Sequence, residues 1–134
     1  MNREIKFRAW DSFNAEMLKP ADYNGKTKEL SWFFAQFEDR QKGGNEMKLM
    51  QFTGLKDKNG KEIYEGDIIN LHQFLFDGFG EVERENKGEI GIDWYGVHLL
   101  TDKEETGCYL ACAYGLHEES FEIIGNIYEN PELI

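Results

Sequence analysis

The chain has 134 residues, of which 26 are acidic and 15 are Lys or Arg, and its formal net charge is −11. This charge repels a phosphate backbone at long range, while an aromatic content of 14% supplies enough apolar area to exclude a disordered acidic segment. Two cysteines are too few for a disulfide framework, the first residues lack the apolar core of a signal peptide, and no apolar run approaches the roughly 20 residues that cross a bilayer. We therefore expect a folded cytoplasmic protein without a membrane span.

The N-terminal residues predict a small β-hairpin. Apolar and polar side chains alternate over residues 5–10, which is the period of a half-buried strand. Turn-forming side chains follow from Asp11 to Asn14, and a returning strand is expected near residues 16–19.

Residues 29–40 predict a helix that ends at Gly43 and Gly44. Four apolar side chains recur at positions i, i+3, i+4 and i+7, which form one stripe of a helix: Leu30, Phe33, Phe34 and Phe37. Alternation through Leu30, Trp32 and Phe34 is a competing strand interpretation, and the pattern leaves both open.

Residues 47–52 predict a strand, and two tight reversals follow it. Asp57 and Gly60 suit the first and last places of a type I turn, whereas Asn59-Gly60 suits a two-residue hairpin. A second bend is expected at residues 65–67. We assign four glycines to backbone geometry rather than to chemistry: Gly54, Gly60, Gly66 and Gly125.

Several short strands are expected after Asp67, separated by glycine-rich loops at residues 76–80 and 85–88. The strands are expected at 68–71, 89–94, 97–100, 108–113 and 121–128. This spacing is typical of a small meandering barrel or half-barrel. The fold class is therefore α+β and mainly β, with an N-terminal mixed α+β lobe over residues 1–54 and a barrel lobe over residues 55–134.

Three blocks of the sequence resemble the YopX family: residues 3–11, residues 50–69 and residues 124–133. They frame nearly the whole chain, so residues 1–134 are identified as a single YopX-like domain. The resemblance implies a phage or prophage origin in a bacterial host, a C-terminal SH3-like barrel and an N-terminal α+β part that takes part in self-association. It implies no reaction and no catalytic residues.

The sequence gives no signature of a catalytic, cofactor or metal site. If Gly60 took the sixth place of a calcium loop, Leu55, Glu62 and Gly66 would fall at ligand or apolar positions that they do not suit. On a strand, Cys108 and Cys112 would lie roughly 13 Å apart at ~3.3 Å per residue, too far to share a metal, so we interpret them as buried structural thiols. The candidate partner ligands do not have zinc-finger spacing: His72, His98 and His117.

We rank a non-enzymatic interaction module that binds a viral or host protein first, a nucleic-acid-associated protein second and an undetected enzyme last. A homo-oligomer is also expected. The protein-binding hypothesis uses an exposed aromatic surface of Tyr64, Trp94 and Tyr95, with Phe74 and Phe79 as further candidates. The nucleic-acid hypothesis uses a basic patch of Lys56, Lys58 and Lys61, to which Arg3, Lys6 and Arg8 would add if the fold brought them close.

Overall fold

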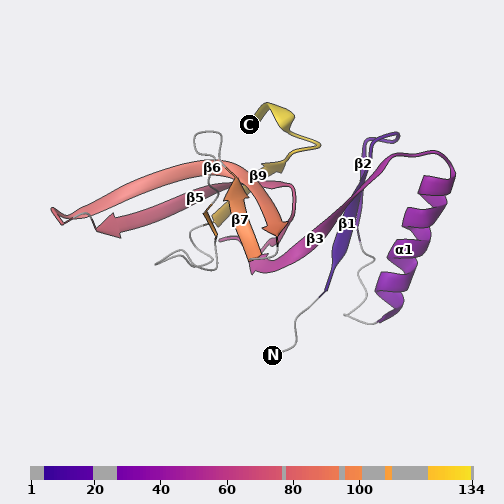
Figure 1. Cartoon of the computed structure of the whole chain (residues 1–134), viewed down its shortest axis with the longest axis horizontal. Coiled ribbons are helices and arrows are strands. Elements are labelled where there is room, and N and C mark those ends of the chain that lie inside the picture. The colour runs from indigo at the N-terminus through magenta and orange to yellow at the C-terminus, as the bar shows by residue number, and fades with distance from the viewer. Residues whose placement is uncertain are drawn as a thin grey trace. The chain divides into compact units, whose positions relative to one another are not determined.

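The structure is a computed structural model that describes residues 5–19, 27–76, 78–93, 96–100, 108–109 and 121–133 (Figure 1). The chain divides into two compact units, Met1–Gly54 and Leu55–Ile134. The described residues are mainly β, as expected, and form two antiparallel sheets with one α-helix and a short 3-10 helix. No helix among these residues is long and apolar enough to cross a membrane.

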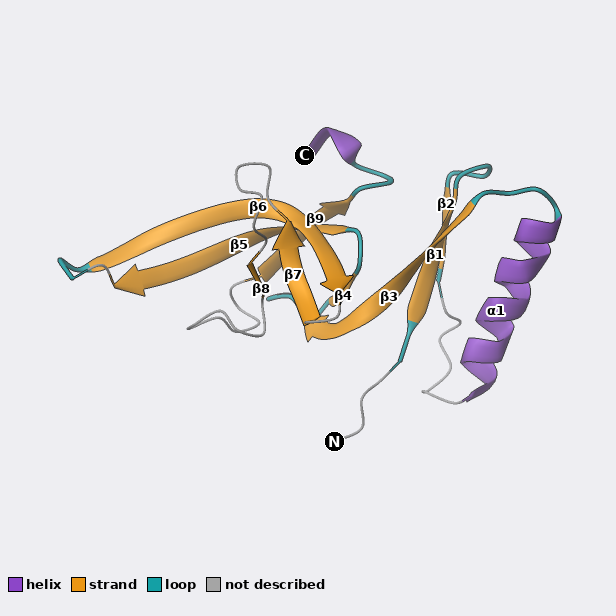
Figure 2. Ribbon diagram, in the orientation of Figure 1, coloured by secondary structure: helices purple, strands orange, loops and turns teal. Residues whose placement is uncertain are grey.

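The first unit contains an antiparallel sheet and a helix (Figure 2). Strand β1 (Phe7–Asp11) pairs with β2 (Glu16–Leu18) on one side and with β3 (Met47–Lys56) on the other. Helix α1 (Thr27–Lys42) connects β2 to β3 along the chain. The predicted hairpin is confirmed. In the sheet order β2-β1-β3-β4, β3 is followed by β4 (Glu62–Tyr64), whose residues belong to the second unit.

Helix α1 confirms the helical interpretation of the Phe-rich segment. Phe33 is 1% exposed, and its ring centroid lies 5.3 Å from that of Phe34. These rings pack with buried residues of the sheet, because the i, i+3, i+4 stripe points one helix face at it. The core of this unit comprises Ala9, Leu18, Phe33 and Met47, with Phe7, Phe34 and Phe37 packed against them.

The helix ends at the predicted glycine pair in a Schellman motif. Gly44 has φ of 93°, Asn45 N donates to Arg40 O at 3.0 Å, and Gly44 N donates to Gln41 O at 3.0 Å. Glycine reaches this left-handed conformation without steric cost, and the two bonds satisfy carbonyls that the helix itself leaves unpaired.

The second unit is built on a five-stranded antiparallel sheet of order β8-β7-β6-β5-β9, curled into a half-barrel (Figure 2). After β4 (Glu62–Tyr64), its strands are β5 (Asp67–Phe76), β6 (Glu81–Asp93), β7 (Gly96–Leu100), β8 (Cys108–Tyr109) and β9 (Phe121–Asn126), and η2 (Pro131–Leu133) follows. The core comprises seven buried residues: Ile63, Ile69, Leu71, Ile90, Val97, Leu99 and Phe121.

The loop expected at residues 85–88 was wrong, because these residues lie inside the continuous strand β6. Their backbone pairs with β5 in unbroken register, from Ile68 opposite Glu89 to Phe76 opposite Glu81. Gly88 is buried opposite Ile69. Glycine weakens a strand but is tolerated where another element approaches closely, so the cluster of Asn, Lys and Gly was a misleading turn signal.

Candidate functional site

The segment from residues 50 to 69 carries the strongest motif in the sequence, and its first reversal is a type I turn. Gly60 N donates to Asp57 O at 3.0 Å, as expected for the first and last places of that turn, and Asp57 N donates to Lys61 O at 2.8 Å. Gly60 has φ of 79°, which is the left-handed place that completes a three-residue hairpin loop. The two-residue alternative centred on Asn59-Gly60 is therefore wrong.

The carboxylate of Asp57 accepts the hydrogen bonds that hold this turn in place. Its side chain is buried, and Oδ1 accepts hydrogen bonds from the backbone N–H groups of Asn59 and Lys61, both at 2.9 Å. Oδ2 accepts a third from Ile123 N in β9 at 3.1 Å. Lys58 N also donates to Phe121 O at 2.9 Å. The turn is thus fastened to a strand that lies more than sixty residues later in the chain.

The electrostatics of Asp57 fit a structural carboxylate. Burial alone would raise the pKa of Asp57, but the three backbone N–H donors outweigh it and hold the pKa below its ordinary value. A carboxylate whose pKa is held below its ordinary value, and whose oxygens already accept three N–H groups, is poorly placed to take or give a proton in a reaction near neutral pH.

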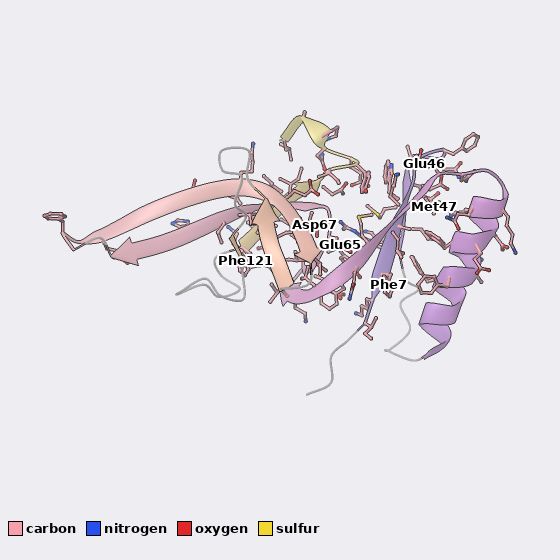
Figure 3. The ribbon with its side chains drawn as sticks, in the orientation of Figure 1. Phe7, Glu46, Met47, Glu65, Asp67 and Phe121 are labelled. Carbon is pink, nitrogen blue, oxygen red and sulfur yellow. The ribbon has the colours of Figure 1, made fainter. Side chains whose placement is uncertain are left out.

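The second bend is held in a similar way. Asp67 is buried, and its Oδ2 accepts from Tyr64 N at 2.8 Å across Glu65 and Gly66 (Figure 3). Gly66 has φ of 83°, its N–H donates to Ile90 O at 2.9 Å, and its O accepts from Ile127 N at 2.9 Å. This bend therefore connects β6 to Ile127, the residue that follows β9.

Residues 126–130 cap the C-terminal end of β9. Asn126 Oδ1 accepts from Tyr128 N at 3.1 Å and from Glu129 N at 2.8 Å. Asn130 lies against the backbone of Gly125, where an added Cβ would come within 2.6 Å of Asn130 Oδ1. The geometric assignment of the four predicted glycines is confirmed, because Gly54, Gly60 and Gly66 have positive φ and Gly125 has no room for a side chain.

The first unit has its own carboxylate hub at Asp11, which sequence reasoning treated only as a turn residue. Asp11 is completely buried. Oδ1 accepts from Phe13 N and Asn14 N, both at 3.1 Å, while Oδ2 accepts from Arg40 at 2.8 Å and from Asn45 at 3.1 Å. Burial would raise the pKa of Asp11, but Asn14 Nδ2, which donates to Oδ2 at 2.8 Å, acts with these donors to hold the pKa well below its usual range. Asp11 thus joins the first hairpin to the end of α1.

The three lysines of the predicted basic patch have exposed side chains: Lys56, Lys58 and Lys61. Lys58 Nζ lies 2.9 Å from Oε2 of Glu122 in β9, so one of the three lysines is paired with an acid. Of the cations proposed to join them, Arg3 lies outside the described residues, Lys6 lies 5.8 Å from the Phe52 ring centroid, and Arg8 is 9% exposed. The surface role expected for Arg8 was wrong.

The residues of the predicted aromatic surface differ in their exposure. Tyr64 is 8% exposed, so its assignment to an exposed surface was wrong; it ends β4, which is tied to the buried second bend. Trp94 and Tyr95 lie outside the described residues, as does the side chain of Phe74. Phe79 is 100% exposed, and Phe13, which sequence reasoning missed, is 79% exposed. An aromatic residue within a predicted turn was the available signal for Phe13.

No group of three or more His, Cys, Asp and Glu side chains in the described part of the chain is arranged to hold a metal ion. Cys108 lies in β8, whereas Cys112 and His117 fall outside the described ranges. The imidazole of His72 in β5 lies between two carboxylates of β6, with Nε2 2.5 Å from Glu83 Oε1 and Nδ1 3.6 Å from Glu85 Oε1.

Comparison with known proteins agrees with the resemblance seen in the sequence. The family model described as YopX protein matches residues 6–134, nearly the whole chain. The crystal structure of protein EF1440 from Enterococcus faecalis is similar, with 26% identity, a TM-score of 0.50 and 96% of each chain covered. No curated protein matched the chain.

Proposed function

The chain belongs to the YopX family, and from this premise we propose that it is a non-enzymatic protein-interaction module of phage or prophage origin. Its partner is a viral or host protein. The family assignment supports the phage-type origin. The interaction role is supported by carboxylates that are buried in the scaffold and aromatic side chains that are exposed to solvent.

One contrast carries the proposal. The buried carboxylates of residues 50–69 accept backbone N–H groups and so act as parts of the scaffold: Asp57 accepts from Asn59, Lys61 and Ile123, and Asp67 accepts from Tyr64. Large aromatic side chains, by contrast, are presented to solvent at two hairpin tips, with Phe13 79% and Phe79 100% exposed. Aromatic anchors on the surface are a common feature of protein-binding sites, where they supply most of the binding energy.

We interpret the second unit as an SH3-like barrel built on the curled five-stranded sheet. The curl of the sheet and the tight turns at residues 57–60 and 64–67 support this interpretation. Such barrels bind extended peptides through grooves and exposed strand edges.

Capture of the tagged chain's partners from a bacterial lysate, with and without nuclease, tests the proposal. We expect a discrete protein to be retained in stoichiometric amount after nuclease treatment. A second untagged copy of the chain in the eluate would identify self-association. Loss of every retained species with nuclease, or a turnover measured with the purified chain, would contradict the proposed function.

A nucleic-acid-associated role is the second candidate, because three lysines are exposed on one hairpin: Lys56, Lys58 and Lys61. It predicts a complex with DNA or RNA that weakens as salt increases and that Lys58→Glu weakens further. Lys58 forms an ion pair with Glu122 at 2.9 Å, and the net charge of the chain is −11. For these two reasons we rank nucleic-acid binding behind protein binding. No binding of either nucleic acid at low ionic strength would remove it.

A further inference from the structure

The hairpin of β5 and β6 extends beyond the rest of its sheet. Among the described residues, β9 pairs with β5 over residues 67–71, and β7 pairs with β6 over residues 89–93. In the described structure, residues 72–76 and 81–88 therefore pair with each other alone, and Figure 1 shows them as a two-stranded arm that projects from the sheet. We call residues 72–76 and 78–88 the β5–β6 arm.

The tip of the arm presents an aromatic side chain to solvent. Phe79 is 100% exposed and lies between Gly78 and Gly80, whose φ values are 93° and 153°. A Phe side chain exposed to this extent leaves its apolar area in water, although burying that area would be favourable. A protein surface that binds a partner is where such a side chain gains that area.

The charged side chains of β6 indicate whether the partner's surface should be acidic or basic. Glu81, Glu83, Glu85 and Lys87 alternate along β6, so they share one face, and all four are exposed; three of the four are acidic. The side chains of Glu83 and Glu85 are 59% and 60% exposed even though His72 lies between their carboxylates. Charged residues on a strand edge also oppose pairing with a second acidic strand.

We infer that the β5–β6 arm is the docking element of this chain, and that it binds a basic protein surface with an apolar recess for Phe79. This inference rests on the proposed function. The recess buries Phe79, and Lys or Arg side chains at its rim pair with the three glutamates. A second copy of the chain, with its own charge of −11, and a nucleic acid backbone both have the wrong sign for this face.

Site-specific photo-cross-linking tests the inference directly. The photoreactive residue p-benzoylphenylalanine replaces Phe79 in one form of the full chain and Phe13, the other exposed aromatic, in a second form. Each form is irradiated in a nuclease-treated bacterial lysate. We expect a discrete cross-linked protein from position 79, and we expect its yield to fall as salt rises, because exposed charge pairs are screened.

A variant without the three glutamate charges distinguishes a specific partner from a protein that is cross-linked by chance. Glu81→Gln, Glu83→Gln and Glu85→Gln together should reduce the yield from position 79 and remove its salt dependence. A matched variant with the same change in net charge should leave both unaltered: Glu38→Gln, Asp39→Asn and Glu132→Gln, all at exposed positions. Once the cross-linked protein is purified, Phe79→Ser should weaken its binding roughly 10- to 100-fold, the factor that corresponds to transfer of a Phe side chain out of water.

The outcomes separate this inference from the function on which it rests. If the tagged wild-type chain retains a protein but position 79 gives no more product than position 13, or the glutamate variant cross-links as well as wild type, the arm is not the docking element. The interaction module would then remain. If the wild-type chain retains no protein at all, both the proposed function and the arm are overturned.

Discussion

Replacement of Asp57 by Ala is expected to destabilise the second unit strongly. The carboxylate is 2% exposed and accepts backbone N–H groups from Asn59, Lys61 and Ile123. Alanine leaves these donors without their acceptor and detaches the hairpin turn from β9. A hydrogen bond to a charged group contributes about 1.5–3 kcal/mol, and the three bonds share one side chain and are not additive. We therefore expect a loss of about 3–5 kcal/mol in the free energy of unfolding.

Urea unfolding followed by circular dichroism measures this loss, with Asp57→Asn as the matched control. Asparagine keeps an oxygen that can accept the two Oδ1 bonds but replaces the other oxygen with an amide nitrogen, so we expect about half of the alanine effect. A loss below about 1 kcal/mol for Asp57→Ala would refute the reasoning, because it would mean that the turn holds without its carboxylate.

Three further predictions concern the fold. Gly66→Val should cost about 2 kcal/mol or more, because a β-branched residue is strained at a φ of 83°; an unchanged melting temperature would contradict this. Gly125→Ala should cost about 1–3 kcal/mol in urea unfolding because its Cβ would meet Asn130, and Asn130→Ala should recover part of that cost if the clash is its source. Asp11 and Asp57 have pKa values lowered by folding, so the stability they provide is present above about pH 4 and is lost as the pH falls through their folded pKa values. The free energy of unfolding of Asp57→Asn should therefore fall less between pH 6 and pH 3 than that of the wild type, and parallel curves would contradict this assignment.

Local patterns in the sequence predicted the elements that depend on nearby residues. The Phe-rich stripe defined α1 because Phe33, Phe34 and Phe37 fall on one helix face, and the Gly-Gly pair ended it. Asp57 and Gly60 located the first turn because the φ of Gly60 and the turn hydrogen bond are set within four residues.

The features that sequence reasoning missed depend on contacts between residues far apart in the chain. The carboxylate of Asp11 meets Arg40 and Asn45, which no spacing rule connects to a turn residue. Residues 85–88 looked like a loop, yet the facing strand β5 keeps them extended. Tyr64 is buried, although its backbone N–H belongs to a tight bend, so its aromatic character gave the wrong expectation of exposure.

Amide hydrogen exchange measured by NMR on the free protein tests most directly whether the family's characteristic segment is scaffold rather than a reactive site. The informative amides are those of Lys61, Tyr64 and Ile123, which donate to the carboxylates of Asp57 and Asp67. We predict that they exchange as slowly as the amide of Gly66, which donates to Ile90 in β6. Exchange at the rate of an exposed loop would contradict this account, because the two carboxylates would then be mobile and available for another role.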